Sequence, residues 1–225
     1  MHPLDNPAWS ALTTAHKQLA QGQSPALRYD LDHAIFAAIP DHTPEALTAL
    51  GALIAATGPA IVAEATPLPP IANITVQKHR MAVQMIAESP LPVDPGFDFL
   101  KLGDEDAPEM LALATLTEPG PFFTRTHRLG RFIGIRQEGR LIAMAGERMR
   151  TPGFAEVSGV CTHPDFRGAG LAGKLMRVVA GRMVERGEVP FLHAYADNAG
   201  AIGLYERLGY RHRIDVNVTV VAPAG

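Results

Sequence analysis

The spacing of apolar residues along the chain predicts a mixture of helices and strands. The clearest helix lies at 171–186, where apolar positions follow the helical repeat and basic side chains lie mostly off that stripe. The clearest strand lies at 213–220, where polar and apolar residues alternate. Further helices are expected at 44–56, after 104–106 and at 198–208, and further strands at 60–65, 81–86, 97–102, 131–136, 141–149, 156–162 and 191–196.

The order of these elements indicates the fold class. After residue 96, strands come first, and then strand, helix, strand, helix and strand follow in turn. That order is typical of a mixed central sheet flanked by helices, an α/β (α+β) fold. The proline-rich stretch at 90–96 interrupts both periodicities. We therefore predict an α/β region of unknown role at 1–95 and a second domain at 96–225.

Composition excludes several classes of protein. The 225 residues carry a formal net charge of −3, which gives no general attraction to nucleic acid. No apolar run reaches the roughly 18–20 residues of a membrane-spanning helix, and we see no signal peptide. The single cysteine, Cys161, allows no disulfide within these residues and no cysteine metal cluster. We therefore expect a cytoplasmic protein with no metal, no nucleic-acid partner and no membrane partner.

One glycine-rich segment carries the main chemical signal. The predicted strand ending at Thr162 is followed by 163–167, and then by Gly168, Gly170 and Gly173 at the start of a basic-faced helix. Backbone N–H groups at such a turn converge near the positive end of the helix dipole, and glycine lets phosphate oxygens come close. The segment therefore suits a pyrophosphate, and a turn without a ligand is the alternative.

Residues 168–173 of the same segment match the G-x-G-x-x-G fingerprint of dinucleotide-binding proteins. That fingerprint follows its strand directly, whereas residues 163–167 intervene here. The acidic Asp197 lies 29 positions after Gly168, instead of about 20. The 28 residues after Asp197 are also too few for the second half of that fold. A dinucleotide-dependent oxidoreductase is therefore the weaker alternative.

Two motifs resemble those of the Gcn5-related N-acetyltransferase (GNAT) superfamily. Residues 167–172, Arg-Gly-Ala-Gly-Leu-Ala, are similar to its R/Q-x-x-G-x-G/A signature, and His-Pro-Asp at 163–165 is similar to the usual lead-in. Residues 198–210 resemble the second hallmark, N-x-x-A-x-x-x-Y-x-x-x-G-F, with Tyr210 in place of phenylalanine. The resemblance covers 97–225 and looks closest to the glycine N-acyltransferase-like branch. For 1–95, a degenerate half-copy of the same fold and one wall of the acceptor pocket are hypotheses.

The resemblance implies acetyl-CoA (coenzyme A) as co-substrate and no metal. The strand before the signature would pair its backbone with pantetheine, and the loop amides would hold the pyrophosphate. Asn198 would contact the pantetheine arm, cap a helix, or do both. The implied cofactor-binding residues are Val160, Cys161, Thr162, Arg167, Gly168, Ala169, Gly170, Leu171, Ala172, Gly173 and Asn198.

The implied reaction is direct attack of an amine, on a small molecule or a peptide, on the thioester. The amine must lose a proton and the departing thiolate must gain one. Tyr205 matches the family's acid position, and Glu156 is the first choice for the base; each also fits a purely structural role. His193, then Glu147, then water relayed by several groups are the alternatives to Glu156.

Cys161 has no evident partner base in the sequence, so we expect a small buried side chain and not a nucleophile. A non-catalytic acyl-CoA-binding sensor is the alternative function to an acyltransferase. The acceptor and the acyl chain length cannot be inferred from these motifs, because fold does not determine substrate. Both a monomer and a homodimer are compatible with the sequence.

Overall fold

The computed structural model describes residues 2–224 and builds one large sheet from both halves of the chain. Its eight strands are ordered β4-β11-β5-β10-β9-β8-β7-β6. All neighbours are antiparallel except β9 and β10, which are parallel. The mixed sheet confirms the predicted fold class. The strands are β4 (Ala60–Glu64), β5 (Ile74–Ile86), β6 (Leu100–Leu102), β7 (Phe132–Gln137), β8 (Arg140–Thr151), β9 (Phe154–Thr162), β10 (Val189–Tyr195) and β11 (Arg211–Pro223).

The strands of the first half are inserted among those of the second. β5 lies between β10 and β11, and β4 lies on the outer side of β11. The predicted boundary at residue 95 therefore separates strands that belong to one sheet. β5 is also longer than the strand predicted at 81–86, because the mostly exposed residues 74–80 pair with β11 although they carry no apolar pattern.

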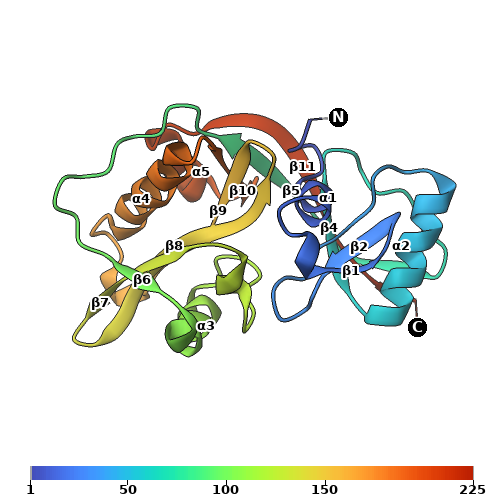
Figure 1. Ribbon diagram of the computed structural model, residues 1–225, viewed down its shortest axis with the longest axis horizontal. Helices are drawn as coiled ribbons and strands as arrows, with labels where there is room; N and C mark the ends of the chain where they lie inside the picture. Colours follow the sequence, from blue (N-terminus) through green and yellow to red (C-terminus); the bar gives the residue numbers. More distant parts are fainter. Residues whose placement is uncertain (1, 225) are drawn as a thin grey trace.

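Helices cover both faces of the sheet. α4 (Leu171–Glu185) packs on one face of β8 and β9, and α3 (Ala107–Thr117) packs on the other (Figure 1). α4 buries the predicted apolar stripe, and Gly187 follows its end at φ +76°. α5 (Ala199–Arg207) follows β10. These helices begin within a few residues of their predicted starts, since their caps and apolar spacing are local in sequence.

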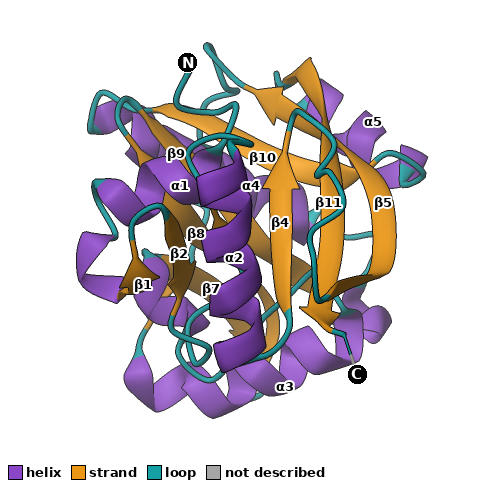
Figure 2. Ribbon diagram, turned by 90° about the vertical axis from the view of Figure 1, so that its right-hand side faces the viewer, coloured by secondary structure: helices purple, strands orange, loops and turns teal. Residues whose placement is uncertain are grey.

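The first half also forms a small sheet of its own. Three short antiparallel strands, none of them predicted, lie beside α1 (Pro7–Thr13) and α2 (Pro44–Thr57). α2 packs against β4 and β11 (Figure 2). The half-copy hypothesis for residues 1–95 stays a prediction. The strands of the small sheet are β1 (Ala20–Gln23), β2 (Ala26–Tyr29) and β3 (Ala37–Ala38).

Candidate active site

Two parallel strands diverge near the centre of the large sheet. β10 pairs with β9 only along Phe154–Glu156, so residues 157–162 have β8 as their strand partner. The register of β9 against β8 also shifts near Gly159, which adopts φ +61°. Because the strands diverge, the last residues of β9 have no strand partner on the β10 side among the described residues. A cavity opens beside this unpaired edge.

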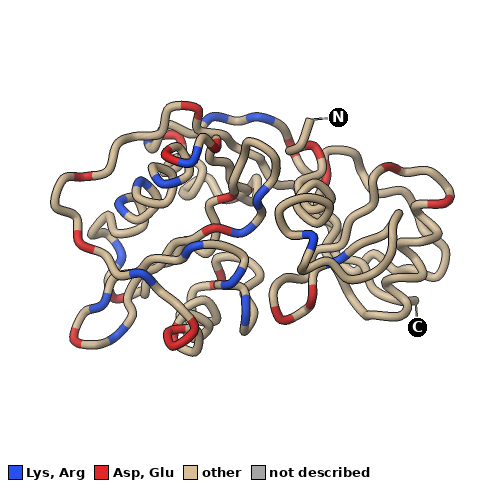
Figure 3. Tube along the Cα trace, in the orientation of Figure 1, with Lys and Arg blue, Asp and Glu red and all other residues tan. Residues whose placement is uncertain are grey.

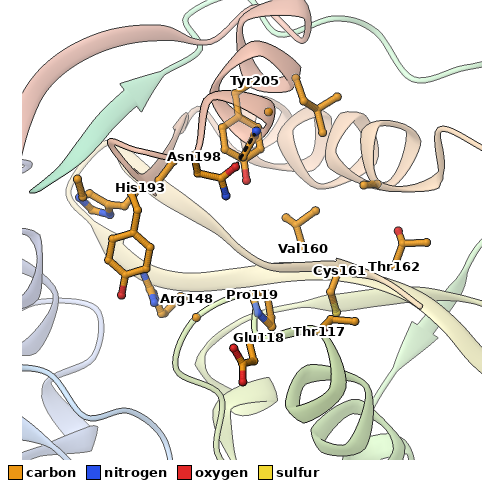
Figure 4. A pocket seen from close by; sticks show the side chains of 18 of the residues that line it. Thr117, Glu118, Pro119, Arg148, Val160, Cys161, Thr162, His193, Asn198 and Tyr205 are labelled. Carbon is orange, nitrogen blue, oxygen red and sulfur yellow. Dashed lines mark hydrogen bonds between the residues drawn. The ribbon is translucent and has the colours of Figure 1, made fainter. Parts of the chain in front are cut away.

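The cavity has a volume of about 690 Å³, a size typical of small-molecule sites. Val160, Cys161 and Thr162 form one wall, and Asn198 and Tyr205 face them from α5 (Figure 4). Most of the predicted cofactor residues meet here. Besides Val160, Cys161, Thr162 and Asn198, they are Arg167, Gly168, Gly170, Leu171, Ala172 and Gly173, whereas Ala169 does not line the cavity.

The glycine loop forms one end of this cavity. Gly168 and Gly170 adopt left-handed backbone conformations, with φ of +86° and +72°. A Cβ atom at either position would meet nothing within 4 Å, so the space in front of the loop is open. Gly170 caps α4, which carries lysine and arginine along its length (Figure 3), and Arg167 and Arg207 also line the cavity. Free amides, a helix N-terminus and cations together suit phosphate groups.

Asn198, the N-cap of α5, and Tyr205, within α5, present polar side chains to the cavity. The Oδ1 atom of Asn198 accepts a hydrogen bond of 3.1 Å from the backbone N–H of Ala201, so its capping role is confirmed. Burial raises the pKa of the Tyr205 phenol. No hydrogen bond of its hydroxyl is found among the described residues, and the hydroxyl points toward Val160 (Figure 4). A protonated, unpartnered phenol at this position can donate a proton to a bound group.

Glu156 lies beside the cavity but not on its wall. Its side chain is fully buried, and its carboxylate accepts two hydrogen bonds from Arg148, at 2.8 and 2.6 Å. It also accepts one of 2.7 Å from Nδ1 of His193. Burial acts to raise the pKa of Glu156, but the charge and hydrogen bonds of Arg148 and His193 outweigh it and hold that pKa well below its usual range. The geometry therefore does not favour direct contact between Glu156 and an acceptor.

The two alternatives to Glu156 lie in different places. His193 lines the cavity, but both ring nitrogens already have partners, Glu156 on one side and Gln84 on the other. Glu147 does not line the cavity. It is buried against Arg186 near the end of α4, at 2.9 Å.

Cys161 lies on the cavity wall as a buried thiol. Burial raises its pKa to about 11. A thiol with that pKa is almost entirely protonated near neutrality, and the thiolate is the nucleophilic form. The structure thus gives Cys161 no feature of an activated nucleophile.

Residues of the first half of the chain line much of the opposite end of the cavity, and their role as a wall of the acceptor pocket stays a prediction. This wall is mostly apolar, and the Arg148 guanidinium lies 4.7 Å from the centre of the Phe36 ring. No role was predicted for Arg148 or for Glu118, which ends α3 in a left-handed conformation and is the one acidic residue among those that line the cavity. The apolar residues that the first half contributes are Pro7, Phe36, Ile61, Ala63 and Ala82, and Val218 of β11 lines the cavity as well.

Comparisons with known proteins agree with this architecture. The FR47-like protein family matches residues 132–220. A solved structure from Novosphingobium aromaticivorans, described as an acetyltransferase of the GNAT family, is 44% identical, and the match covers 100% of both chains with a TM-score of 0.92. A GCN5-related N-acetyltransferase from Kribbella flavida is 20% identical over 100% of this chain and 97% of that one, with a TM-score of 0.69, and so supports the fold.

A shorter match is to a mycothiol acetyltransferase from Corynebacterium aurimucosum, which is 46% identical over 61 residues. That match spans 27% of this chain and only 20% of the relative. Among the helices of residues 2–224, none is long and apolar enough to cross a membrane. The mixed, largely antiparallel sheet and the intervening residues 163–167 do not support the dinucleotide-binding alternative.

Proposed function

Because the chain belongs to the GNAT superfamily of acetyltransferases, we propose that it transfers an acetyl group from acetyl-CoA to an amine by direct attack in a ternary complex. The observation that carries this proposal is one continuous cavity. It joins the glycine loop before α4, the unpaired edge of β9, the hydroxyl of Tyr205 and the apolar wall from the first half. The proposed acceptor is an amine on a small molecule or a peptide.

The cavity residues divide into two groups along its length. At the loop end, the amides around Gly168 and Gly170 and the charges of Arg167 and Arg207 would hold the phosphates of acetyl-CoA. The open edge of β9 would pair with the pantetheine arm, as the family resemblance implies. Acetyl-CoA would supply the thioester, and the end near Tyr205 and Arg148 would receive the amine.

Tyr205 is the proposed general acid. As the amine nitrogen forms its bond to the carbonyl carbon, the bond from that carbon to sulfur breaks. The phenol of Tyr205 would donate its proton to the sulfur and later recover one from solvent. The raised pKa of Tyr205 favours the protonated form that this step needs.

The general base is inferred from the side chains that remain free to contact the amine. Glu156 is proposed only in a positioning role, because its oxygens are occupied by Arg148 and His193. Glu118 is the acidic residue among those that line the cavity, and its carboxylate makes no hydrogen bond or ion pair within residues 2–224. We propose that the amine loses its proton to Glu118, directly or through solvent. Glu118→Gln should then suppress the acidic limb of the pH–rate profile, and an unchanged limb would rule Glu118 out.

Thermal or chemical unfolding with acetyl-CoA tests the site. At 100 times the dissociation constant, ligand should stabilise the protein by about 2.7 kcal/mol. Gly170→Asp should abolish this gain, since it places a carboxylate where the phosphates would lie. Gly153→Asp is the matched control, because Gly153 has a similar φ of +78° and open surroundings in the turn between β8 and β9. Equal stabilisation of both variants would refute the assignment.

Release of the CoA thiol, followed with a panel of amines, then tests transfer. Turnover distinguishes the enzyme from a non-catalytic acyl-CoA sensor, which would bind acetyl-CoA without releasing thiol. The glycine N-acyltransferase-like branch, a cytoplasmic location and a monomeric or homodimeric state stay predictions.

A further inference from the structure

We propose that Gln84, on β5 in the first half of the chain, is a positioning residue of the active site. It holds His193 in one tautomer, and through His193 it orients the pair formed by Glu156 and Arg148. The effect of Gln84 on catalysis rests on the proposed function, because this effect requires the acceptor to bind at the Arg148 end of the cavity. The hydrogen-bond geometry itself does not depend on that assumption.

Glu156 determines which nitrogen of His193 carries the hydrogen. Nδ1 of His193 lies 2.7 Å from Oε1 of Glu156. An ionised carboxylate can only accept, so Nδ1 must be the donor. In a neutral imidazole, Nε2 is then an acceptor with a free lone pair. That lone pair needs a donor, because the ring is largely buried, with 13% of its side chain exposed.

Gln84 supplies this donor. Its amide nitrogen lies 3.1 Å from Nε2 of His193. The two residues are direct partners across the antiparallel pair of β5 and β10. Neighbours of this kind lie close enough for side-chain contact. The chain positions are 109 residues apart, so this contact exists only because β5 is inserted beside β10.

Two other contacts determine the orientation of the Gln84 amide. Arg213 donates to its Oε1 atom at 2.9 Å, and its Nε2 atom donates to the carbonyl oxygen of Leu4 at 2.8 Å. Arginine only donates and a carbonyl only accepts, so both contacts require the same orientation. Asp5 holds Arg213 in turn, at 2.6 Å. Gln84 is fully buried, so it cannot exchange these partners for solvent.

The same contacts reach the wall of the cavity. Glu156, held by His193, binds Nε and Nη2 of Arg148. The Nη1 atom of Arg148 makes no hydrogen bond within the described residues, and the guanidinium lines the cavity. Since both nitrogens of His193 are occupied, its role is to hold Glu156 and Arg148 and not to take a proton from the acceptor.

Nitrogen-15 spectroscopy of the histidine rings tests this directly. At pH 8, wild-type His193 should carry hydrogen on Nδ1 and none on Nε2, with its signals assigned by their loss in His193→Gln. Gln84→Glu replaces the donor by an acceptor, so both nitrogens should carry hydrogen. Gln84→Met removes the donor at similar volume, so the Nε2 signal should shift and both tautomers should be present.

Gln77→Met is the matched control, because Gln77 lies on the same strand with an exposed side chain. Gln77→Met should leave the His193 signals unchanged. A wild-type spectrum with hydrogen on Nε2, or a Gln84→Met spectrum identical to wild type, would overturn the proposal. The wild-type spectrum decides the tautomer even if a Gln84 variant fails to fold.

Kinetics supply the second readout. With an amine that the panel identifies, kcat/KM for the amine should fall at least tenfold in Gln84→Met, while the Kd of acetyl-CoA changes less than twofold. An unchanged kcat/KM would overturn the positioning role. If wild-type protein binds no acetyl-CoA, the proposed function fails, whereas the spectra still decide whether Gln84 holds His193.

Discussion

The two ends of the cavity are built in different ways. The loop end comes mainly from one short stretch, 160–173, whose working groups are mostly backbone amides and glycine, with Arg207 of α5 beside it. The acceptor end is built from side chains of β5, β8, β9 and β10 that hold one another through hydrogen bonds. One end therefore depends on local backbone conformation, and the other depends on contacts between strands that are distant in the chain.

The two ends also differ in how much a substitution should change the free energy of unfolding. Arg148 and Glu156 form an ion pair in the interior, with 11% and 0% of their side chains exposed. Removing one member of such a pair leaves a buried charge without compensation, which costs more than the intact pair contributes. Arg167 at the loop end is exposed and holds only a long contact of 3.4 Å to a backbone oxygen. Substitutions at the acceptor end should therefore mainly lower the free energy of unfolding. Substitutions at the loop end should mainly weaken the binding of acetyl-CoA.

Arg148→Met should show the largest effect. It leaves the Glu156 carboxylate buried and unpaired, so the free energy of unfolding should fall by about 3–5 kcal/mol. Arg167→Met at the loop end should cost no more than about 0.5 kcal/mol. Urea unfolding measures both. The double variant Arg148→Met/Glu156→Gln removes both charges and should recover most of the lost free energy of unfolding. If Arg148→Met and Arg167→Met lower the free energy of unfolding equally, the two ends of the cavity do not differ in the way described.

Acid should lower the free energy of unfolding in two stages. His16 is buried, with its Nδ1 atom 3.0 Å from the hydroxyl oxygen of Tyr29. Burial lowers the pKa of His16 to about 4, below the ordinary histidine value of about 6.5, so between those values the unfolded chain binds a proton that the folded chain does not. Stability should therefore fall by about 3 kcal/mol as the pH drops through this window. The lowered pKa of Glu156 adds a further loss below the usual carboxyl range near 4.3.

Urea midpoints between pH 7 and pH 3 measure both stages. His16→Gln should remove the first stage and leave the second. A wild-type midpoint that stays constant from pH 7 to pH 4 would show that His16 is not held neutral by the fold.

Tyr205→Phe should lower kcat about 10²-fold, since general acid catalysis contributes roughly 10²–10⁴-fold and a thiolate is a fairly good leaving group. Stability and acetyl-CoA binding should change little, because the ring remains. Tyr210→Phe is the control, because the Tyr210 hydroxyl is buried and has no hydrogen-bond partner in residues 2–224. If both variants keep wild-type kcat, positioning alone drives the reaction.

Cys161→Ala should have the smallest effect, with kcat within about twofold of wild type, because the protonated thiol takes no part in chemistry. Steady-state kinetics with both substrates varied should follow a sequential pattern. Ping-pong kinetics, or an acetyl group on Cys161 in a mass spectrum, would contradict this expectation.

Much of the loop end could be predicted from the sequence. The strand ending at Thr162, the turn at 163–170 and the helix beginning at Leu171 are all near their predicted places. Their signals are local, since glycine conformation, helix capping and apolar spacing each depend on neighbours in the chain. The same reasoning found Tyr205 and Asn198, because both belong to one short motif on α5.

The acceptor end could not be predicted in this way. The sequence suggested Glu156 as a base and a boundary at residue 95, and it carried no sign that β5 pairs with β10. That pairing places Gln84 beside His193, and the bulged pairing of β8 with β9 places Arg148 beside Glu156. Hydrogen bonds between strands have no sequence period of their own, so only the tertiary structure decided that a buried, ionised Glu156 faces Arg148 and His193 and not the cavity.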